Sequence, residues 1–311
     1  MGRVDNRDAF LDTFALERAR GITIFSKQAV FPLGDASVTL LDTPGHVDFS
    51  AEMERTLQVL DFALLLVSGT DGVQSHTRTL WQLLRRYRIP TFLFVNKMDL
   101  PGKGKDGIME ELRRELSEGC VAFDEGTSAL HEELALLDEG LMEQVLETGK
   151  LEDAQIAELI ASRSVFPCFF GAALRMEGVD ELLSALQRYT KEPRYPAEFS
   201  AQVYKIARGE KDERLTFLKV TGGTLAVKQV LRGEDWEEKA DQLRLYSGAK
   251  FQSLDEAEAG AVVAVTGLSH TFPGQGLGAE PDWAGAVLQP VLTYRVELSD
   301  GTDPHTALQK L

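Results

Sequence analysis

Short apolar runs alternate with amphipathic segments through roughly the first 190 residues of the chain. The runs lie near residues 22–30, 37–41, 62–67, 91–95 and 165–170, and apolar residues between them recur at helical spacing. This alternation is typical of strand–helix units that build a doubly wound sheet. We therefore expect an α/β domain and interpret the helical stripes as core, not as cofactor contacts.

The pattern changes twice along the chain. An acidic stretch at about 119–164 carries Leu134, Leu137, Leu141 and Val145 in helical register, which predicts a helical insertion that packs on the α/β domain. Beyond a proline-bracketed linker near 193–196, short runs at 201–207, 215–221 and 261–268 are separated by glycine-containing turns. These features predict three units: residues 1–194 with the insertion, a small β-barrel at 197–286, and the start of a further domain at 288–311.

Composition narrows the function. A formal net charge of −16 argues against general affinity for DNA or RNA, because binding a polyanion depends on Lys and Arg. The chain has two cysteines, Cys120 and Cys168, which are far apart in sequence and lack metal-ligand spacing. They predict a reduced compartment, the cytoplasm, without a disulfide framework. No apolar segment of the sequence is long enough to span a bilayer, so we expect no membrane association.

Two apolar runs end in polar motifs that fit a nucleotide site. The run at 91–95 is followed by Asn96, Lys97, Met98 and Asp99. A carboxylate such as Asp99 can accept hydrogen bonds from guanine N1 and from its exocyclic amine, which adenine does not offer. Asn96 would face the other edge of the base, and the stem of Lys97 would lie along its plane.

The run at 38–41 ends in Asp42, Thr43, Pro44, Gly45 and His46. A strand-end Asp42 would hold Mg²⁺ through water, since this small cation keeps much of its hydration shell, and Gly45 would let a backbone N–H approach a γ-phosphate. Because ligands collect at the carboxyl ends of strands in open α/β sheets, the two motifs are expected to share one site.

Two weaker motifs extend this hypothesis. The hydroxyl of Thr23, in the segment Arg20–Gly21–Ile22–Thr23, would complete the metal shell when the γ-phosphate is present and release it after hydrolysis. After the run at 165–170, a backbone N–H of the Gly171, Ala172, Ala173 segment would donate to guanine O6.

Taken together, LERARGIT at 16–23, DTPGHVDF at 42–49, DGVQSHT at 71–77 and NKMD at 96–99 resemble translational GTPases of the elongation factor G type, and among these the ribosomal protection tetracycline resistance proteins. The resemblance covers nearly the whole chain. It implies a GTP-binding domain with GTP or GDP and Mg²⁺ as ligands, a β-barrel, action on the ribosome as a monomer, and GTP hydrolysis that drives release of the factor. The family's catalytic histidine falls on His46, which would orient the attacking water. Ala172 departs from the pattern, because the family usually has Ser there.

A larger departure is that no GxxxxGK[ST] motif occurs; the glycine-rich stretches at 101–107 and 274–278 do not fit it. This motif supplies the phosphate cradle. We therefore expect a chain shortened at its start, with the strand that carries this loop missing from between the strands ending at Leu41 and Val67. Because Asp303 and Pro304 begin a helix and the chain stops at Leu311, we expect it to be shortened at its end as well. The chain as written is expected to bind GTP poorly and to be inactive.

Three functions remain open at this stage. The first is a GTP-hydrolysing ribosome factor, whether a resistance protein or an elongation factor. The second is a non-catalytic ribosome-binding protein with a degenerate GTPase domain, which the retained DTPGH and NKMD motifs argue against. The third is a related GTPase with another ribosomal task, such as a release-factor-like or stress-linked protein.

Overall fold

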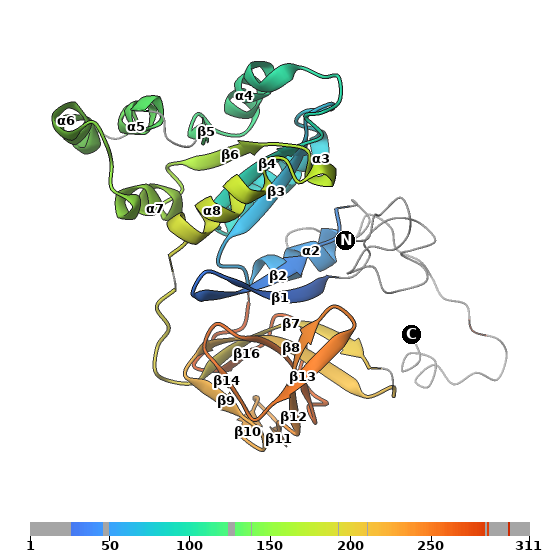
Figure 1. Cartoon of the computed structure of the whole chain (residues 1–311). Coiled ribbons are helices and arrows are strands. Elements are labelled where there is room, and N and C mark those ends of the chain that lie inside the picture. Colours follow the sequence, from blue (N-terminus) through green and yellow to red (C-terminus); the bar gives the residue numbers. More distant parts are fainter. Residues whose placement is uncertain are drawn as a thin grey trace.

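The computed structural model describes residues 26–45, 50–123, 128–137, 139–191, 193–209, 211–283, 285 and 298. In Figure 1 a helix-covered sheet lies at the top, a β-barrel at the bottom, and a two-stranded hairpin between them. None of the helices in these ranges combines the length and apolarity needed to cross a bilayer. The predicted residues Thr23 and His46 lie outside the described residues.

The upper part is a parallel sheet with strand order β3-β4-β6-β5, formed by β3 (Ala63–Ser68), β4 (Thr91–Asn96), β5 (Cys120–Ala122) and β6 (Phe166–Phe170). Side chains alternate between its two faces. Leu93, Val95 and Cys168 pack toward α3 (Ser75–Arg86) and α4 (Gly104–Glu115), whereas Phe92 and Phe94 pack toward α7 (Asp153–Ala161) and α8 (Val179–Tyr189). Burial on both faces explains why these strands are continuous apolar runs, and it confirms the predicted strands at 62–67, 91–95 and 165–170.

The stretch predicted as an insertion, at about 119–164, contains helices. It consists of α5 (Ser128–Ala135), α6 (Glu139–Thr148) and α7, between β5 and β6. Leu134 and Val145 are buried in the core that α8 shares, and Leu141 packs against it. Leu137 was expected in the same stripe, but it lies beyond the end of α5 and is 40% exposed.

The two cysteines, far apart in the sequence, are neighbours in the sheet. Cys120 and Cys168 lie on neighbouring strands, where Ala122 pairs with Cys168 and Cys120 with Phe166. Both are free and buried, and burial raises the pKa of Cys168 well above its ordinary value. Parallel pairing of distant segments, which spacing along the sequence does not reveal, brings them together.

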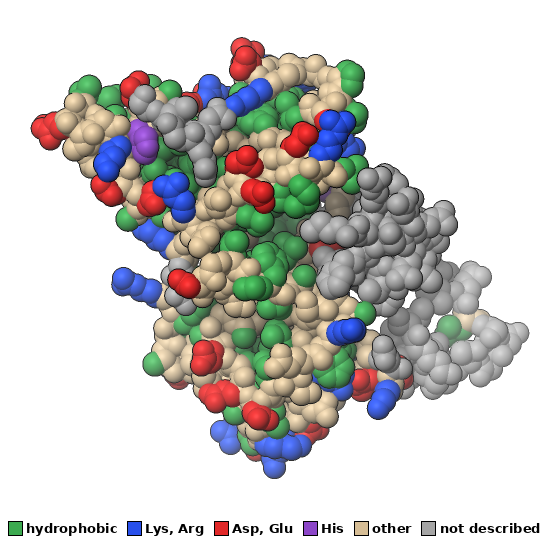
Figure 2. Space-filling model, in the orientation of Figure 1, with side chains coloured by type: hydrophobic (Ala, Val, Ile, Leu, Met, Phe, Trp, Pro, Cys, Tyr) green, Lys and Arg blue, Asp and Glu red, His purple; other side chains and the backbone are tan. Residues whose placement is uncertain are grey.

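The first two strands do not join the parallel sheet. β1 (Lys27–Leu33) and β2 (Ala36–Asp42) form their own antiparallel hairpin, which the sequence assigned to the doubly wound sheet. β3 is therefore an edge strand, and its outward residues Leu64 and Leu66 are 39% and 60% exposed. Hydrophobic side chains gather in this middle region on the face seen in Figure 2.

The lower part is an antiparallel six-stranded sheet with order β13-β12-β15-β8-β7-β16, curved around one apolar core. Its strands are β7 (Ser200–Arg208), β8 (Arg214–Gly222), β12 (Gln242–Ser247), β13 (Lys250–Leu254), β15 (Val262–Thr266) and β16 (Gly276–Gly278). Two short pairs complete it: β9 (Thr224–Ala226) with β14 (Glu256–Glu258), and β10 (Val230–Arg232) with β11 (Glu237–Lys239).

The hairpin is attached to the barrel. The backbone N–H of Gly248 donates to the Gln28 carbonyl at 2.8 Å, and Gln28 Nε2 donates to the Val262 carbonyl at 3.0 Å. Leu41 packs on a small apolar cluster that contains Tyr204. β2 is thus held by the barrel and not by the parallel sheet.

The helix that follows, α2 (Ser50–Leu57), is joined to the barrel by charged contacts. Lys205 Nζ lies 3.4 Å from Glu52 Oε1. Just beyond the helix, Lys219 Nζ donates to Asp61 Oδ1 at 2.6 Å and to the Val59 carbonyl at 3.1 Å. These bonds fix α2 and the start of β3 against the barrel.

Candidate functional site

Three loops meet at the carboxyl edge of the parallel sheet, after β3, β4 and β6. The N–H of Gly69, after β3, donates to the Asn96 carbonyl at 2.8 Å, and the N–H of Met98, after β4, donates to the Gly171 carbonyl at 3.0 Å. Backbone bonds therefore hold the NKMD loop from both sides. This is the edge at which open α/β sheets bind ligands.

Asn96 connects two of these loops through its side chain. Its Oδ1 accepts from the N–H of Lys97 at 2.8 Å and from the N–H of Ala173 at 2.9 Å. An acceptor that receives two backbone donors is fixed in orientation, so the Asn96 amide nitrogen also has a fixed direction. We call this pair of bonds the Asn96 clamp.

Lys97 adopts a positive φ of 66°. A side chain other than glycine is strained in this left-handed region, and such residues concentrate where function requires them. The turn that it forms is closed by the N–H of Leu100, which donates to the Lys97 carbonyl at 3.2 Å. The turn places Asp99 on the loop two residues beyond the strained position.

Asp99 is in contact with Arg175, which sequence reasoning missed. Arg175 Nη2 lies 3.1 Å from Asp99 Oδ2, and the side chains are 60% and 18% exposed, respectively. Arg175 ends the one-turn helix η3 (Ala173–Arg175), which directly follows Gly171 and Ala172. The signal available in the sequence was a basic residue two positions beyond the GAA segment, but only the fold shows that it faces the NKMD loop.

The backbone donors assigned to guanine O6 are engaged within the protein. The N–H of Ala172 donates to the Glu177 carbonyl at 3.1 Å, and that of Ala173 belongs to the Asn96 clamp. A bond from Ala173 to a base would therefore have to be shared with Asn96. Gly171 is required here for steric reasons, because a Cβ would lie 2.0 Å from the Glu177 carbonyl oxygen.

The third loop contributes a carboxylate beside Lys97. Asp71 accepts from Ser68 Oγ at 2.7 Å and from Thr70 Oγ1 at 3.1 Å. These two hydrogen bonds, with the charge of Lys97 adding to them, hold the pKa of Asp71 below its ordinary value. The edge therefore carries fixed charges of both signs.

Of the residues predicted for phosphate and metal, the structure describes Asp42 and Gly45, which belong to the hairpin segment and not to the parallel sheet. Asp42 is the last residue of β2, and Gly45 is exposed, with no atom of the described residues within 4 Å of an added Cβ. Among the described residues, no group of three acidic, histidine or cysteine side chains could hold a metal by itself. Asp42 fits a magnesium ion that takes most of its ligands from phosphate and water.

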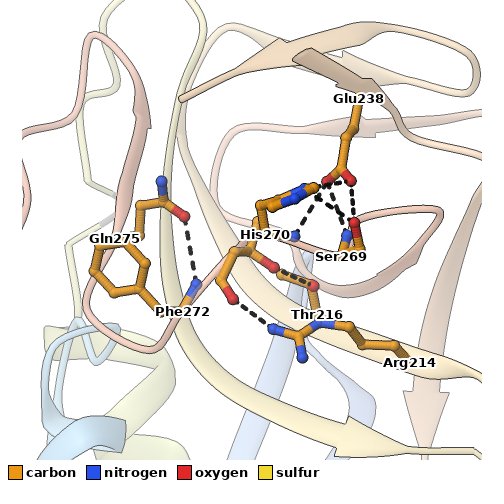
Figure 3. Close-up of polar contacts among 8 residues, drawn as sticks. Arg214, Thr216, Glu238, Ser269, His270, Phe272 and Gln275 are labelled. Atoms are coloured by element: carbon orange, nitrogen blue, oxygen red, sulfur yellow. Dashed lines mark hydrogen bonds and ion pairs between the residues drawn. The ribbon is translucent and has the colours of Figure 1, made fainter. Parts of the chain in front are cut away.

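A second polar cluster lies in the barrel, where Glu238 on β11 meets the loop between β15 and β16 (Figure 3). Glu238 accepts from the N–H of Ser269 at 2.8 Å and from the Ser269 hydroxyl, and its Oε1 lies 2.8 Å from His270 Nδ1. Burial pulls the pKa of Glu238 upward, but the hydrogen bonds from Ser269 and His270 hold it below its ordinary value. We interpret the cluster as a clamp on the loop.

Two family models match the chain, one over the parallel-sheet domain and one over the barrel. Residues 1–192 match the Elongation factor Tu GTP binding domain, and residues 198–277 match Elongation factor G domain 2. The chain belongs to the translational GTPases of the elongation factor G type. The sequence-based resemblance and fold class are thereby confirmed.

Known translational GTPases that resemble the chain include tetracycline resistance proteins. It is 34% identical to the oxytetracycline resistance protein of Streptomyces rimosus over 89% of its own length and 48% of the relative. It is 32% identical to TetP of Clostridium perfringens over 91% and 47%. A crystal structure of a protein from Thermus thermophilus superposes with a TM-score of 0.79 at 22% identity, over 90% of this chain and 50% of that one. The chain spans about half the length of the relatives it matches.

Proposed function

We propose that this chain is the guanine-nucleotide-binding part of a GTPase that acts on the ribosome and hydrolyses GTP to GDP. The observation that carries the proposal is the Asn96 clamp, which joins the loops after β4 and β6 and directs Asp99 to the same edge. The similarity to tetracycline resistance proteins favours a ribosomal protection or elongation-factor-like task in the cytoplasm.

The base would bind over the NKMD loop. Asp99 would accept from guanine N1–H and from the exocyclic amine, and the Asn96 amide would donate to the other edge of the ring. The stem of Lys97, which is exposed, would cover one face of the base. Ala172 and Ala173 would border the O6 side.

The γ-phosphate and Mg²⁺ would lie toward β2. Asp42 and Thr23 would hold the ion, with phosphate and water completing its shell, and Gly45 would donate its N–H to the phosphate. Mg²⁺ would neutralise developing charge on the phosphoryl group. His46 would orient the attacking water when the ribosome is bound, since phosphoryl transfer depends chiefly on positioning and charge stabilisation.

The lack of a GxxxxGK[ST] motif limits what this polypeptide does by itself. Without that loop there is no backbone cradle for the β- and γ-phosphates. We infer that the chain as written binds GTP weakly and does not hydrolyse it. The same absence favours the second candidate, a non-catalytic ribosome-binding protein with a degenerate GTPase domain.

We propose that this function is divided among three units. Residues 1–194 would form the nucleotide domain, with the helical insertion near 119–164; residues 197–286 would form the barrel, and 288–311 would begin a third domain. The protein would act as a monomer, without membrane or DNA partners.

Nucleotide titration tests the proposal. Two charge-assisted hydrogen bonds to Asp99, at about 1.5 kcal/mol each, predict a preference for GDP over ADP of roughly a hundredfold. Fluorescent GDP and ADP analogues would measure it on the chain as written. An absence of preference contradicts guanine recognition, and GDP binding at micromolar strength or tighter contradicts the weak-binding claim.

A substitution at Asp99 provides the matched test. Asp99→Asn replaces an acceptor by an amide donor, which suits the second carbonyl of xanthine better than the amine of guanine. The GDP preference should disappear and xanthosine diphosphate should bind better than in the unmodified chain. Asp153→Asn is the control, because Asp153 is a half-exposed carboxylate on α7 that pairs with Arg188 away from this edge.

A further inference from the structure

Arg175 contacts the carboxylate that would recognise guanine. Its Nη2 is 3.1 Å from Asp99 Oδ2. The backbone that carries Arg175 is closed by two hydrogen bonds between Ala172 and Glu177, at 3.1 and 3.2 Å, and the next residue, Met176, turns the chain with a φ of 62°. The anchor of Arg175 is therefore fixed, whereas its side chain is 60% exposed and can change rotamer.

The guanidinium resembles the edge of guanine that Asp99 would bind. In guanine, N1–H and the exocyclic amine are both attached to C2, which with its three nitrogens forms a guanidine unit. Arginine presents the same kind of donors on a planar fork. Arg175 Nη2 contacts Asp99 Oδ2, which is one of the two carboxylate oxygens that the base would engage. Asp99 cannot give its full hydrogen-bonding capacity to both at once.

We propose that Arg175 is an intramolecular competitor for the guanine base, which occupies Asp99 and lowers guanine affinity until a base displaces it. The proposal rests on the guanine-nucleotide function proposed above and assigns a specificity-determining role to a residue outside the NKMD motif. Displacement costs little, because an ion pair with one exposed partner is worth no more than about fivefold in an equilibrium constant.

Two other roles for Arg175 predict the opposite sign. If Arg175 attracted the phosphates at long range, removing its charge would weaken GDP and ADP binding alike. If it oriented Asp99 for the base, removing it would weaken GDP binding alone. Competition predicts that GDP binds more tightly and that ADP is unaffected, because adenine does not use Asp99.

The experiment compares the chain with Arg175→Met, which keeps an apolar stem and removes the guanidinium. Affinities for fluorescent GDP and ADP analogues are measured from low to about 1 M salt. Arg175→Met should bind GDP two- to fivefold more tightly at low salt, with ADP unchanged, and the gain should disappear at high salt. Arg175→Lys, which keeps the charge without the planar fork, should bind GDP with an affinity between those of the unmodified chain and Arg175→Met.

Arg232→Met is the control for a lost charge. Arg232 forms an exposed pair with Glu237 in the barrel at 2.8 Å, so its removal should leave both affinities unchanged. A GDP preference over ADP without any gain in Arg175→Met overturns the competition and leaves the proposed function intact. If no variant distinguishes GDP from ADP, guanine recognition itself fails, and the competition fails with it.

Discussion

The ion pair between Lys219 and Asp61 joins a buried side chain to a partly exposed one, so removing either partner should destabilise the protein by a different amount. The Nζ–Oδ1 distance is 2.6 Å, and the side chains are 6% and 40% exposed, respectively. Lys219 also donates to the Val59 carbonyl at 3.1 Å and lies 5.8 Å from the centre of the Tyr195 ring. The ammonium is therefore buried at the junction of barrel and α/β domain, whereas the carboxylate reaches water.

The difference in burial between Lys219 and Asp61 determines how much each substitution should lower the free energy of unfolding. Asp61→Ala leaves a buried ammonium with only a carbonyl and an aromatic face, which should destabilise the protein by about 2–4 kcal/mol. Lys219→Met removes the buried charge, keeps most of the stem and returns the Asp61 carboxylate to water. Its cost is the lost hydrogen bond to the Val59 carbonyl, about 1 kcal/mol. Asp61→Ala should thus be the more damaging change by at least about 1 kcal/mol.

Urea unfolding followed by circular dichroism measures both variants, with the shift in midpoint converted through the slope of the unfolding curve. The exposed pair Lys228–Asp241, at 2.7 Å with side chains 65% and 52% exposed, is the control. Lys228→Met and Asp241→Ala should each cost less than about 1 kcal/mol. If Lys219→Met is as destabilising as Asp61→Ala, the reasoning from unequal burial is refuted.

Two further predictions concern a glycine and a pH-dependent loop. Gly171→Ala should lower the free energy of unfolding by about 1–3 kcal/mol, because the new Cβ would lie 2.0 Å from a backbone carbonyl oxygen. Gly45→Ala should change it by less than about 0.5 kcal/mol, because no atom of the described residues lies within 4 Å of the new Cβ. Equal melting temperatures of the two variants would contradict this prediction. The pKa of Glu238 is lowered from 4.5 in the folded state, so its contacts stabilise the loop above that pH and are lost as pH falls through the lowered value. The amide of Ser269, which donates to Glu238, should report this in an NMR titration with a midpoint below 4.5, and a midpoint at or above 4.5 would show that the hydrogen bonds do not favour the ionised form.

The sequence predicted those elements whose signal is local. β4 begins with a run of five buried residues and leads directly into NKMD, and both the strand and the turn follow from that order. The barrel strands were likewise marked by alternation and by glycine turns. Motif order identified the family because each motif directly follows a strand, and parallel strands bring their carboxyl ends to one edge.

Contacts between distant segments were not predictable in this way. Arg175 lies 76 positions from Asp99 (175 − 99), and only the pairing of β4 with β6 makes them neighbours. The same pairing engages the N–H of Ala173 with Asn96, which a motif scan treats as a free donor. The attachment of β1 to the barrel depends on Gln28 meeting Val262, and no periodicity in either segment encodes that contact.

The attachment of the hairpin changes how the candidate site should be understood. The base-recognition loops follow strands of the parallel sheet, and the Asn96 clamp joins the loops after β4 and β6 to each other. Asp42 ends β2 of the hairpin, which the barrel contacts through Gln28, and the barrel also contacts α2 through Lys205. Asp99, proposed for the base, thus belongs to the parallel-sheet domain, and Asp42, proposed for the metal, belongs to the hairpin that the barrel holds. The two parts are joined through α2 and the buried contact of Lys219 with Asp61. A nucleotide that contacts both parts would hold them in one relative position.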